Sequence, residues 1–375
     1  MIARISGAFE TQVGKLPGQT PMSLAAAAAT GALREAGLGW NDVDALITTT
    51  PVVDPRARQA LALGEYFGIL GQLSWASTVS VGGASPLTAI VEASRLVADG
   101  TAQVVVVVAA DAPRTGHSRT ATVDSFAKMR NPYWEQPYGL LNVGAYALLA
   151  SNYLDRFGLG PEVLAPPAVA MREMARSNPA AIYRDPLTVD DVLESRLVSD
   201  PLRLLECSPI SDGGAAVVVT RDGDGPRVLG WGHGYQYDSV SFAKLPYVSG
   251  CGRAAEIALR MADVSLNELD VVFLYDSYSI ALLYELEEIG FCEAGSGADY
   301  IASGGIGMAS ALPINTHGGL LSHAHIGGGA GMNHVVEAVR QFVGTSANQV
   351  EGVERVLVHN EGGILSAHCC AVLGR

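Results

Sequence analysis

The chain has 375 residues, 49% of them hydrophobic, and a mean hydropathy of +0.24, which is typical of a globular protein with one large core or two medium ones. Acidic residues outnumber basic residues by 38 to 24 and give a formal net charge of -14, so a surface that follows nucleic-acid phosphates is not expected. No run of about 18 apolar residues is present, and the N-terminus lacks the basic-then-apolar layout of a secretion signal, so we expect a cytoplasmic protein without a membrane segment.

The first part of the chain alternates helical and strand patterns. A helix rich in small residues is predicted over 23–37, and a β-branched strand that ends at Pro51 follows it. A helix near 57–67, the strand "WASTVSV" and a helix over 86–98 come next. The run "AQVVVVVAADA" shows no polar alternation, which is typical of a strand buried on both faces of a sheet. These patterns predict an α/β fold with a parallel or mixed sheet.

The same order of elements returns in the second half of the chain. "WNDVDALI" is matched by "LNELDVVF", and "GGASPLTAIVEASRLVADG" with its following apolar strand is matched by "GGGAGMNHVVEAVRQF" followed by "VERVLVHNEGG". Two matched blocks in the same order indicate an internal duplication. We therefore expect two similar α/β halves, residues 1–222 and 223–375, packed together.

Residues 113–200 differ in composition from both halves. Proline and aromatic residues cluster in "NPYWEQPYG", and polar helices such as "TVDDVLESRL" occur. We interpret this segment as a loop domain inserted into the first half. It either covers a substrate or is an excursion without a function of its own.

The stretch "VSVGGASPLTAI" runs from a strand into a helix across a turn of small residues. Free amide groups at the start of a helix stabilise negative charge, so this junction is a candidate site. Ser85 before Pro86 is predicted to cap the helix, whereas a nucleophilic serine would need a histidine base that the sequence does not place. Gly83 carries no reactive group, and it lets a ligand or another backbone come close.

Polar residues also gather at strand ends in the second half. "LYDSYS" and "HNEGG" end apolar strands, "SPISDGGAAVVV" precedes another, and "NTHGGLLSHAHIGGGAG" places His317, His323 and His325 in a glycine-rich loop before a helix. These histidines fit metal ligands, donors to an oxyanion or structural hydrogen-bonding groups, and we favour an oxyanion donor. The five cysteines lack Cys-x-x-Cys spacing, so we expect neither a zinc site nor a disulfide framework, but buried small side chains.

Several of these motifs occur in the order found in the thiolase superfamily. "DPLRLLECSPISDGGAAVVV", "YDSYSIALLYELEEIGFCEAG", "NTHGGLLSHAHIGGGAG" and "LVHNEGGILSAHCCAVL" resemble its sterol-carrier-protein-x or lipid-transfer-protein branch, and the resemblance covers nearly the whole chain. It implies the thiolase fold, with two duplicated halves in five α/β/α/β/α layers and an inserted loop domain. It also implies a coenzyme A thioester as substrate and a homodimer.

The resemblance also places the family's functional positions on this chain. The nucleophilic cysteine of the family falls on Gly83, and the serine of its Cys-x-Ser loop falls on Ser85. The histidine of the family's Gly-His-Pro loop, which belongs to the oxyanion hole, is kept as His325, although Ile326 replaces the proline. The family's His-Asp-Cys-Phe loop, which includes the acid/base cysteine, falls in order on Tyr275, Asp276, Ser277 and Tyr278. Both catalytic thiols are therefore missing.

Without a cysteine, thiolysis through an acyl-enzyme is not expected. A thioester enolate, in contrast, needs only hydrogen-bond donors at its oxygen, and His325 supplies one. Family members without the cysteine resemble steroid side-chain aldolases that work with a DUF35-type partner carrying a zinc ribbon and an OB-fold. We therefore predict an acyl-CoA retro-aldolase, a carbon–carbon lyase that cleaves a β-hydroxyacyl-CoA, such as a steroid 17-hydroxy-20-carboxyl-CoA, to a ketone and a shorter acyl-CoA.

This prediction includes a DUF35-type partner, and no metal and no cofactor beyond the coenzyme A of the substrate. Two alternatives stay open: a catalytically silent homologue that binds acyl-CoA or scaffolds a complex, and an acyltransferase or hydrolase that uses Ser85 or another residue. A tyrosine acting as base would need a lowered pKa or a proton relay. Besides His325, the candidates for base or proton shuttle are Tyr275, Asp276, Tyr278 and His323. The candidate substrate-binding residues are Gly83, Ser85, His317, Gly328, Gly362 and Gly363.

Overall fold

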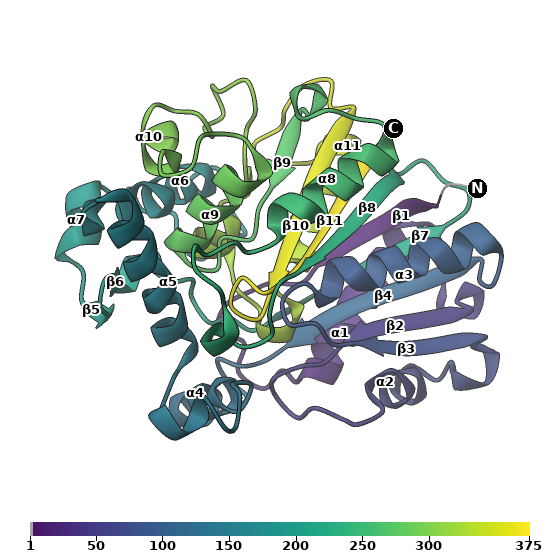
Figure 1. Ribbon diagram of the computed structural model, residues 1–375. Coiled ribbons are helices and arrows are strands. Elements are labelled where there is room, and N and C mark those ends of the chain that lie inside the picture. The colour runs from purple at the N-terminus through teal and green to yellow at the C-terminus, as the bar shows by residue number, and fades with distance from the viewer. Residues whose placement is uncertain (1–2) are drawn as a thin grey trace.

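The computed structural model describes residues 3–375, and their main strands form one mixed sheet that runs through the molecule (Figure 1). Within these residues the sheet has nine strands, in the order β3-β2-β4-β7-β1-β8-β11-β10-β9. The first half consists of β1 (Arg4–Glu10), α1 (Pro21–Glu35), β2 (Ala45–Thr49), α2 (Gln59–Phe67), β3 (Trp75–Val79), α3 (Ser85–Asp99), β4 (Val104–Asp111) and β7 (Gly213–Thr220). The second half consists of β8 (Arg227–Tyr235), α8 (Cys251–Ala262), β9 (Val271–Phe273), α9 (Ser279–Ile289), α10 (Gly297–Ala302), α11 (Met332–Val343), β10 (Arg355–Gly362) and β11 (Ala367–Gly374).

The two halves of the sheet share one topology. β3-β2-β4-β7-β1 of the first half corresponds to a short segment at Ile314 followed by β9-β10-β11-β8 of the second half. The Ile314 segment pairs in parallel with Val272 of β9, as β3 pairs in parallel with β2. The halves meet where Arg4 of β1 lies opposite Arg227 of β8. The topology confirms the internal duplication.

Helices cover the sheet so that five layers result. α1 and α2 pack on the outer face of the first half, α3 and α11 lie between the two halves, and α8 and α9 cover the outer face of the second half. The apolar run of β4 shows no alternation because both of its faces are covered. Val105 and Val107 belong to the core around α3 and α11, whereas Val106 and Val108 belong to the core around α1. The predicted arrangement in five layers is confirmed.

The start of α3 differs from the prediction in one respect. The helix begins at Ser85, and Ala84 precedes it as the cap residue, so the predicted capping role of Ser85 is wrong. Its hydroxyl accepts a hydrogen bond from Val81 N at 2.8 Å and donates to Gly82 O at 2.6 Å. The side chain thus closes the turn before the helix because the turn, rather than the helix end, offers it both a donor and an acceptor.

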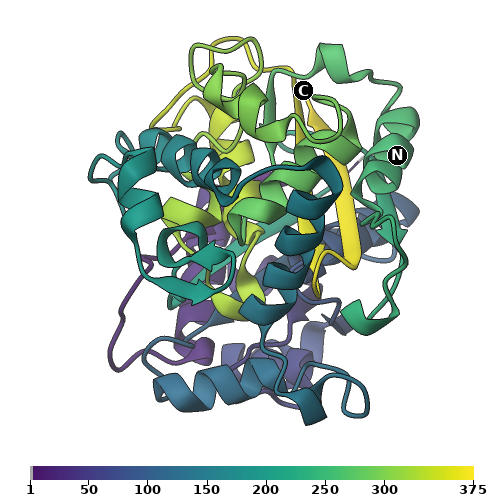
Figure 2. The same ribbon diagram turned by 60° about the vertical axis from the view of Figure 1, so that its left-hand side comes forward.

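The inserted segment lies beside one end of the sheet, opposite the two chain termini (Figure 1), and Figure 2 shows its helices in front of the strands. It buries apolar side chains of α5 and α6 in the same core as α8 and α9, although it belongs to the first half by sequence. Its elements are α4 (Arg119–Ala127), α5 (Asn142–Phe157), α6 (Ala165–Ala175), α7 (Val189–Glu194), β5 (Leu197–Ser199) and β6 (Leu202–Arg203). Within residues 3–375, none of the helices combines the length and apolarity needed to cross a bilayer.

Candidate active site

Four segments distant in sequence meet at the start of α3. The turn at Gly82 packs on the backbone of Gly362 and Gly363, where a Cβ added to Gly82 would lie 2.7 Å from Gly363 N. Next to it, Gly83 lies against Tyr275, which follows β9, and Tyr275 in turn lies beside the loop that leads to α11. Gly82 adopts a φ of +64°, a conformation that favours glycine. The predicted site residues Gly83, Gly362, Gly363 and Tyr275 are thus brought together.

Gly83 has no room for a side chain. A Cβ built on it would overlap the hydroxyl group of Tyr275 and the carbonyl oxygen of Glu361. Tyr275 is 3% exposed, so its ring cannot swing out to solvent to make room. The tyrosine therefore fills the place where a nucleophilic side chain on position 83 would lie, and this explains the glycine.

Tyr275 and His325 form a pair of hydrogen-bonding groups at this point. The Tyr275 hydroxyl lies 3.4 Å from Nε2 of His325, and the rings are inclined by 78°. Burial lowers the pKa of His325 to about 4 and raises the pKa of Tyr275 well above its usual value of 10. At neutral pH the imidazole is therefore neutral and the phenol protonated. Both groups can donate a hydrogen bond to a developing oxyanion, but neither is tuned to act as a base.

Asp276 is fully buried and all its interactions are internal. Oδ1 accepts hydrogen bonds from Leu320 N at 2.8 Å and from the Asn315 amide at 3.0 Å, and Oδ2 accepts one from Leu321 N at 3.1 Å. Burial raises its pKa to about 7 in spite of these backbone donors. The carboxylate shapes the single π-helical turn Gly319–His323, which the sequence pattern describes only as a loop. The geometry gives Asp276 a role in holding that turn.

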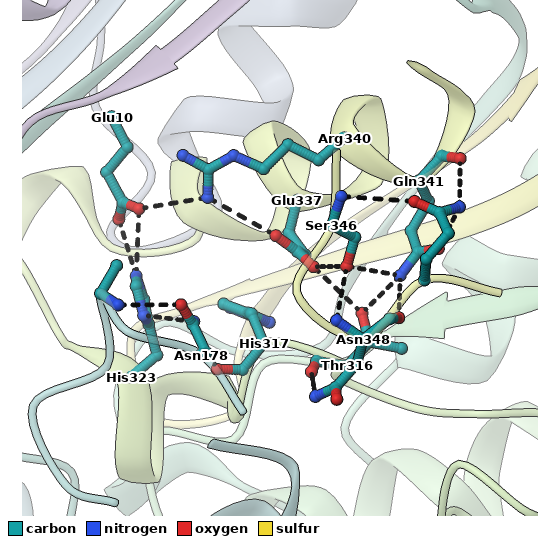
Figure 3. Close-up of polar contacts among 12 residues, drawn as sticks. Glu10, Asn178, Thr316, His317, His323, Glu337, Arg340, Gln341, Ser346 and Asn348 are labelled. Atoms are coloured by element: carbon teal, nitrogen blue, oxygen red, sulfur yellow. Dashed lines mark hydrogen bonds and ion pairs between the residues drawn. The ribbon is translucent and has the colours of Figure 1, made fainter. Parts of the chain in front are cut away.

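His323 belongs to a polar cluster with Glu10 and Asn178 (Figure 3). Its Nε2 lies 2.9 Å from Glu10, and its Nδ1 lies 3.2 Å from the Asn178 amide. Arg340 reaches Glu10 at 3.8 Å and Glu337 at 3.5 Å on the other side of this cluster. Both ring nitrogens of His323 therefore have partners, and the structure does not bring it to the pair of Tyr275 and His325.

The interactions of His317 and Gly328 are with residues other than Tyr275 and His325. The His317 ring is packed between His323 and His334 at centroid distances of 5.0 and 5.1 Å, and burial lowers its pKa well below 6.5. Gly328 N donates to Asp111 at 2.9 Å, at the ends of strands of the first half. Among residues 3–375, no group of three or more histidine, cysteine or acidic side chains is arranged to hold a metal ion.

The sequence analysis missed a carboxyl group that the structure places at the site. Glu361 is the next-to-last residue of β10 and is 1% exposed. Its Oε2 accepts a hydrogen bond from Tyr146 of α5 at 2.6 Å, and its Oε1 accepts one from Leu365 N at 2.9 Å. The ring of Tyr146 stacks on the predicted site residue Tyr278 at 4.2 Å. The polar motif "HNEGG" signals Glu361, whereas nothing near Tyr146 in the sequence signals a partner 215 residues away.

The cysteines do not replace the missing nucleophile. Cys251, Cys369 and Cys370 are buried as expected, whereas Cys207 and Cys292 are only partly buried. Burial raises the pKa of Cys207 and of Cys369 to about 12, and that of Cys292 to about 11. All three thiols are protonated at neutral pH, and a protonated thiol is a poor nucleophile.

Comparison with known proteins identifies relatives of the whole chain. The family model "Thiolase, N-terminal domain" matches residues 3–223, and "Thiolase C-terminal domain-like" matches residues 232–375. A steroid side-chain-cleaving aldolase of Thermomonospora curvata is 33% identical over 96% of this chain and 95% of its own. A 17-hydroxy-3-oxo-4-pregnene-20-carboxyl-CoA lyase of Mycobacterium tuberculosis is 36% identical over 96% of this chain and 97% of its own.

Solved structures agree with this grouping. The Ltp2-ChsH2(DUF35) aldolase is 32% identical and superposes with a TM-score of 0.87 over 100% of this chain and 97% of its own. Human mitochondrial 3-ketoacyl-CoA thiolase, at 16% identity, has a TM-score of 0.76 over 100% of this chain and 98% of its own, which shows the shared fold.

Proposed function

The chain belongs to the thiolase family, and from this premise we propose that it is an acyl-CoA retro-aldolase, a carbon–carbon lyase that cleaves a β-hydroxyacyl-CoA to a ketone and a shorter acyl-CoA. The observation that carries the proposal is the Tyr275 hydroxyl in the place of a side chain on Gly83. An acyl-enzyme cannot form there, so the reaction must proceed on the thioester itself.

His325 and Tyr275 stabilise the charge that develops when the carbon–carbon bond breaks. The electron pair of that bond moves to the α-carbon and the thioester oxygen, which forms an enolate. Two buried donors 3.4 Å apart can share this oxygen, and one such donor contributes about 3 kcal/mol to lowering the barrier. Proton transfers and hydrogen bonds suffice for these steps, so we expect no cofactor beyond the coenzyme A of the substrate.

The relatives support the substrate class and the partner. Two of them are named for the cleavage of a steroid side chain and of a 17-hydroxy-3-oxo-4-pregnene-20-carboxyl-CoA, so a branched β-hydroxyacyl-CoA of this kind is the proposed substrate. The aldolase of known structure is a complex with a DUF35 protein, and we propose that this chain works with a partner of the same type.

We also propose a homodimer that forms through β3. This strand is at one edge of the sheet, and an unpaired edge is a template for pairing with another chain. Trp75 of β3 is 42% exposed on the face of the sheet toward α3, where its indole donates to Glu92, and Leu61, Tyr66 and Leu70 are exposed on α2 and the turn after it, on the other face. Pairing of two such edges would cover these apolar side chains.

The proposal is tested by following the cleavage of a steroid 17-hydroxy-20-carboxyl-CoA by mass spectrometry, with the chain purified together with a DUF35-type partner. The expected products are the 17-ketone and the shortened acyl-CoA in equal amounts. Saturable binding without products, for this compound and for simpler branched β-hydroxyacyl-CoAs, would contradict the proposal and favour a catalytically silent homologue.

A further inference from the structure

Retro-aldol cleavage requires a base for the proton of the β-hydroxyl, and four residues expected for this task are not suited to it. Burial raises the pKa of Tyr275 and of Tyr278, which keeps both phenols protonated. Asp276 holds the π-helical turn, and His323 holds Glu10 and Asn178. A base must therefore come from another residue at the same place.

Glu361 lies at this place. Its backbone oxygen lies against Gly83, so its Cα is adjacent to the start of α3 where the thioester is expected. The hydroxyl of Tyr146, which binds the Glu361 carboxyl at 2.6 Å, lies 3.4 Å from Oγ of Ser277. The side chain of Glu361 therefore extends from the Gly83 turn toward the end of β9, between the two groups of residues that border the site.

We propose that Glu361 is a catalytic residue that takes the proton of the β-hydroxyl and returns a proton to the α-carbon, with Tyr146 as the residue that positions its carboxylate. This inference rests on the proposed retro-aldol function. The carboxylate removes the hydroxyl proton, the oxygen forms a carbonyl double bond, and the bond between the α- and β-carbons breaks. Its electron pair enters the enolate held by His325 and Tyr275. The protonated Glu361 then transfers its proton to the α-carbon and is a carboxylate again, so no further reactant is needed.

The surroundings of Glu361 are consistent with a proton carrier. Burial raises the pKa of Glu361 to about 7, although the hydrogen bond from Tyr146 opposes this shift. A base is most effective when its pKa lies near the working pH. The positive charge of Arg130, itself 6% exposed, lowers the pKa of Glu361 in the same way. The titratable groups that face it are Arg130, Tyr146, Tyr237, Tyr247, Tyr275, Tyr278 and Glu285.

This assignment gives the inserted segment a function. Tyr146 lies on α5, so the insertion supplies the hydroxyl that holds Glu361 and the ring that stacks on Tyr278. Arg130 lies on the same segment, before α5. The insertion therefore contributes to the chemistry of the site as well as covering it.

The first test is Glu361→Gln, a change that keeps the shape of the side chain and removes the base. We expect kcat for cleavage to fall about 10²–10⁴-fold, while the affinity for acyl-CoA stays close to wild type and the melting temperature is not lowered. The matched control is Glu337→Gln, because Glu337 is also buried but contacts Arg340 at 3.5 Å in the polar cluster of His323 instead of the site. Cleavage by Glu361→Gln at a near wild-type rate would overturn the assignment, whereas wild-type protein without any cleavage would count against the proposed function itself.

A second test does not depend on knowing the substrate. Wild-type protein incubated with propionyl-CoA in D₂O is expected to exchange the α-hydrogens, because the same carboxylate removes and returns them, and Glu361→Gln is expected to abolish this exchange. Undiminished exchange in Glu361→Gln would show that another group protonates the α-carbon and would overturn the inference.

A third test distinguishes a positioning role of Tyr146 from a purely structural role. Tyr146→Phe removes the donor that favours the charged carboxylate, so the pKa of Glu361 rises and the acid limb of kcat moves to higher pH, with most of the rate recovered at alkaline pH. A uniform loss of rate with an unmoved acid limb would contradict the positioning role.

Discussion

Gly83 and Tyr275 share one volume of the site between them. A side chain on the first and the phenol of the second cannot coexist, because a Cβ on Gly83 would overlap the Tyr275 hydroxyl. The loss of a nucleophile and the gain of a tyrosine are therefore a single structural change. It replaces a group that forms a covalent bond with a group that donates a hydrogen bond.

The variant Gly83→Cys tests this coupling. The introduced side chain must displace Tyr275, and overpacking of this kind lowers the free energy of unfolding by about 1–3 kcal/mol. We expect lower stability in denaturant unfolding, less cleavage, and no acyl group on the protein by intact mass. A variant of wild-type stability that carries an acyl group on the introduced thiol would refute the coupling.

Replacing His325, the second hydrogen-bond donor of the site, tests whether this side chain stabilises the enolate. His325→Ala removes the imidazole that lies 3.4 Å from Tyr275, and we expect kcat to fall at least about a hundredfold with the fold intact. Circular dichroism and acyl-CoA binding serve as controls for folding. A near wild-type rate would remove His325 from the mechanism.

The raised pKa of Glu361 also predicts a pH dependence of stability. The native state holds this proton up to a pH of about 7, whereas the unfolded chain releases it near 4.5, so the native state loses stability as the pH rises between these values. The loss is on the order of 3 kcal/mol, and Glu361→Gln lacks it. We therefore expect Glu361→Gln to gain stability relative to wild type between pH 4.5 and 7 in urea titrations. A constant difference across this range would show that the native pKa is not raised.

At the scale of elements, local patterns predict what depends on local sequence. The apolar run of β4 indicated a strand covered on both faces, and Val106 and Val107 indeed belong to different cores. The helix after Pro86 was predicted within one residue of its ends at 85 and 99. The role of Ser85 was not predicted, because its hydroxyl binds the turn at Val81 and Gly82 instead of the helix.

Contacts between distant elements could not be predicted in this way. His323 and His325 alternate in the motif "HAH", yet one binds Glu10 of β1 and the other lies beside Tyr275. The π-helical turn Gly319–His323, organised by Asp276, directs them apart. The pairing of Tyr146 with Glu361 joins the insertion to the last part of the chain and leaves no local signal in either segment.

At the scale of the whole molecule, the internal duplication of the fold determines where the site lies. Each half contributes the start of a central helix, α3 or α11, and the amide groups at both starts favour negative charge between them. The two halves are joined through β1 and β8, so the central helices are buried against both. The order of repeated motifs was visible in the sequence, whereas the residues that meet between the repeats required the structure.

The proposed dimer makes a prediction at this scale. Trp75→Glu places a charge on the exposed edge of β3 and is expected to convert dimers to monomers in size-exclusion chromatography with light scattering. The matched control is Trp134→Glu, an exposed tryptophan on the inserted segment away from this edge. A dimer that persists in Trp75→Glu would place the interface elsewhere.

The central claim is that cleavage proceeds without an acyl-enzyme, and the dependence of the rate on free coenzyme A tests it most directly. With a branched β-hydroxyacyl-CoA as substrate, we predict that ketone and shortened acyl-CoA form at the same rate with and without added coenzyme A, and that the intact mass of the protein stays unchanged during turnover. A rate that requires added coenzyme A, or an acyl group found on the protein, would contradict the account.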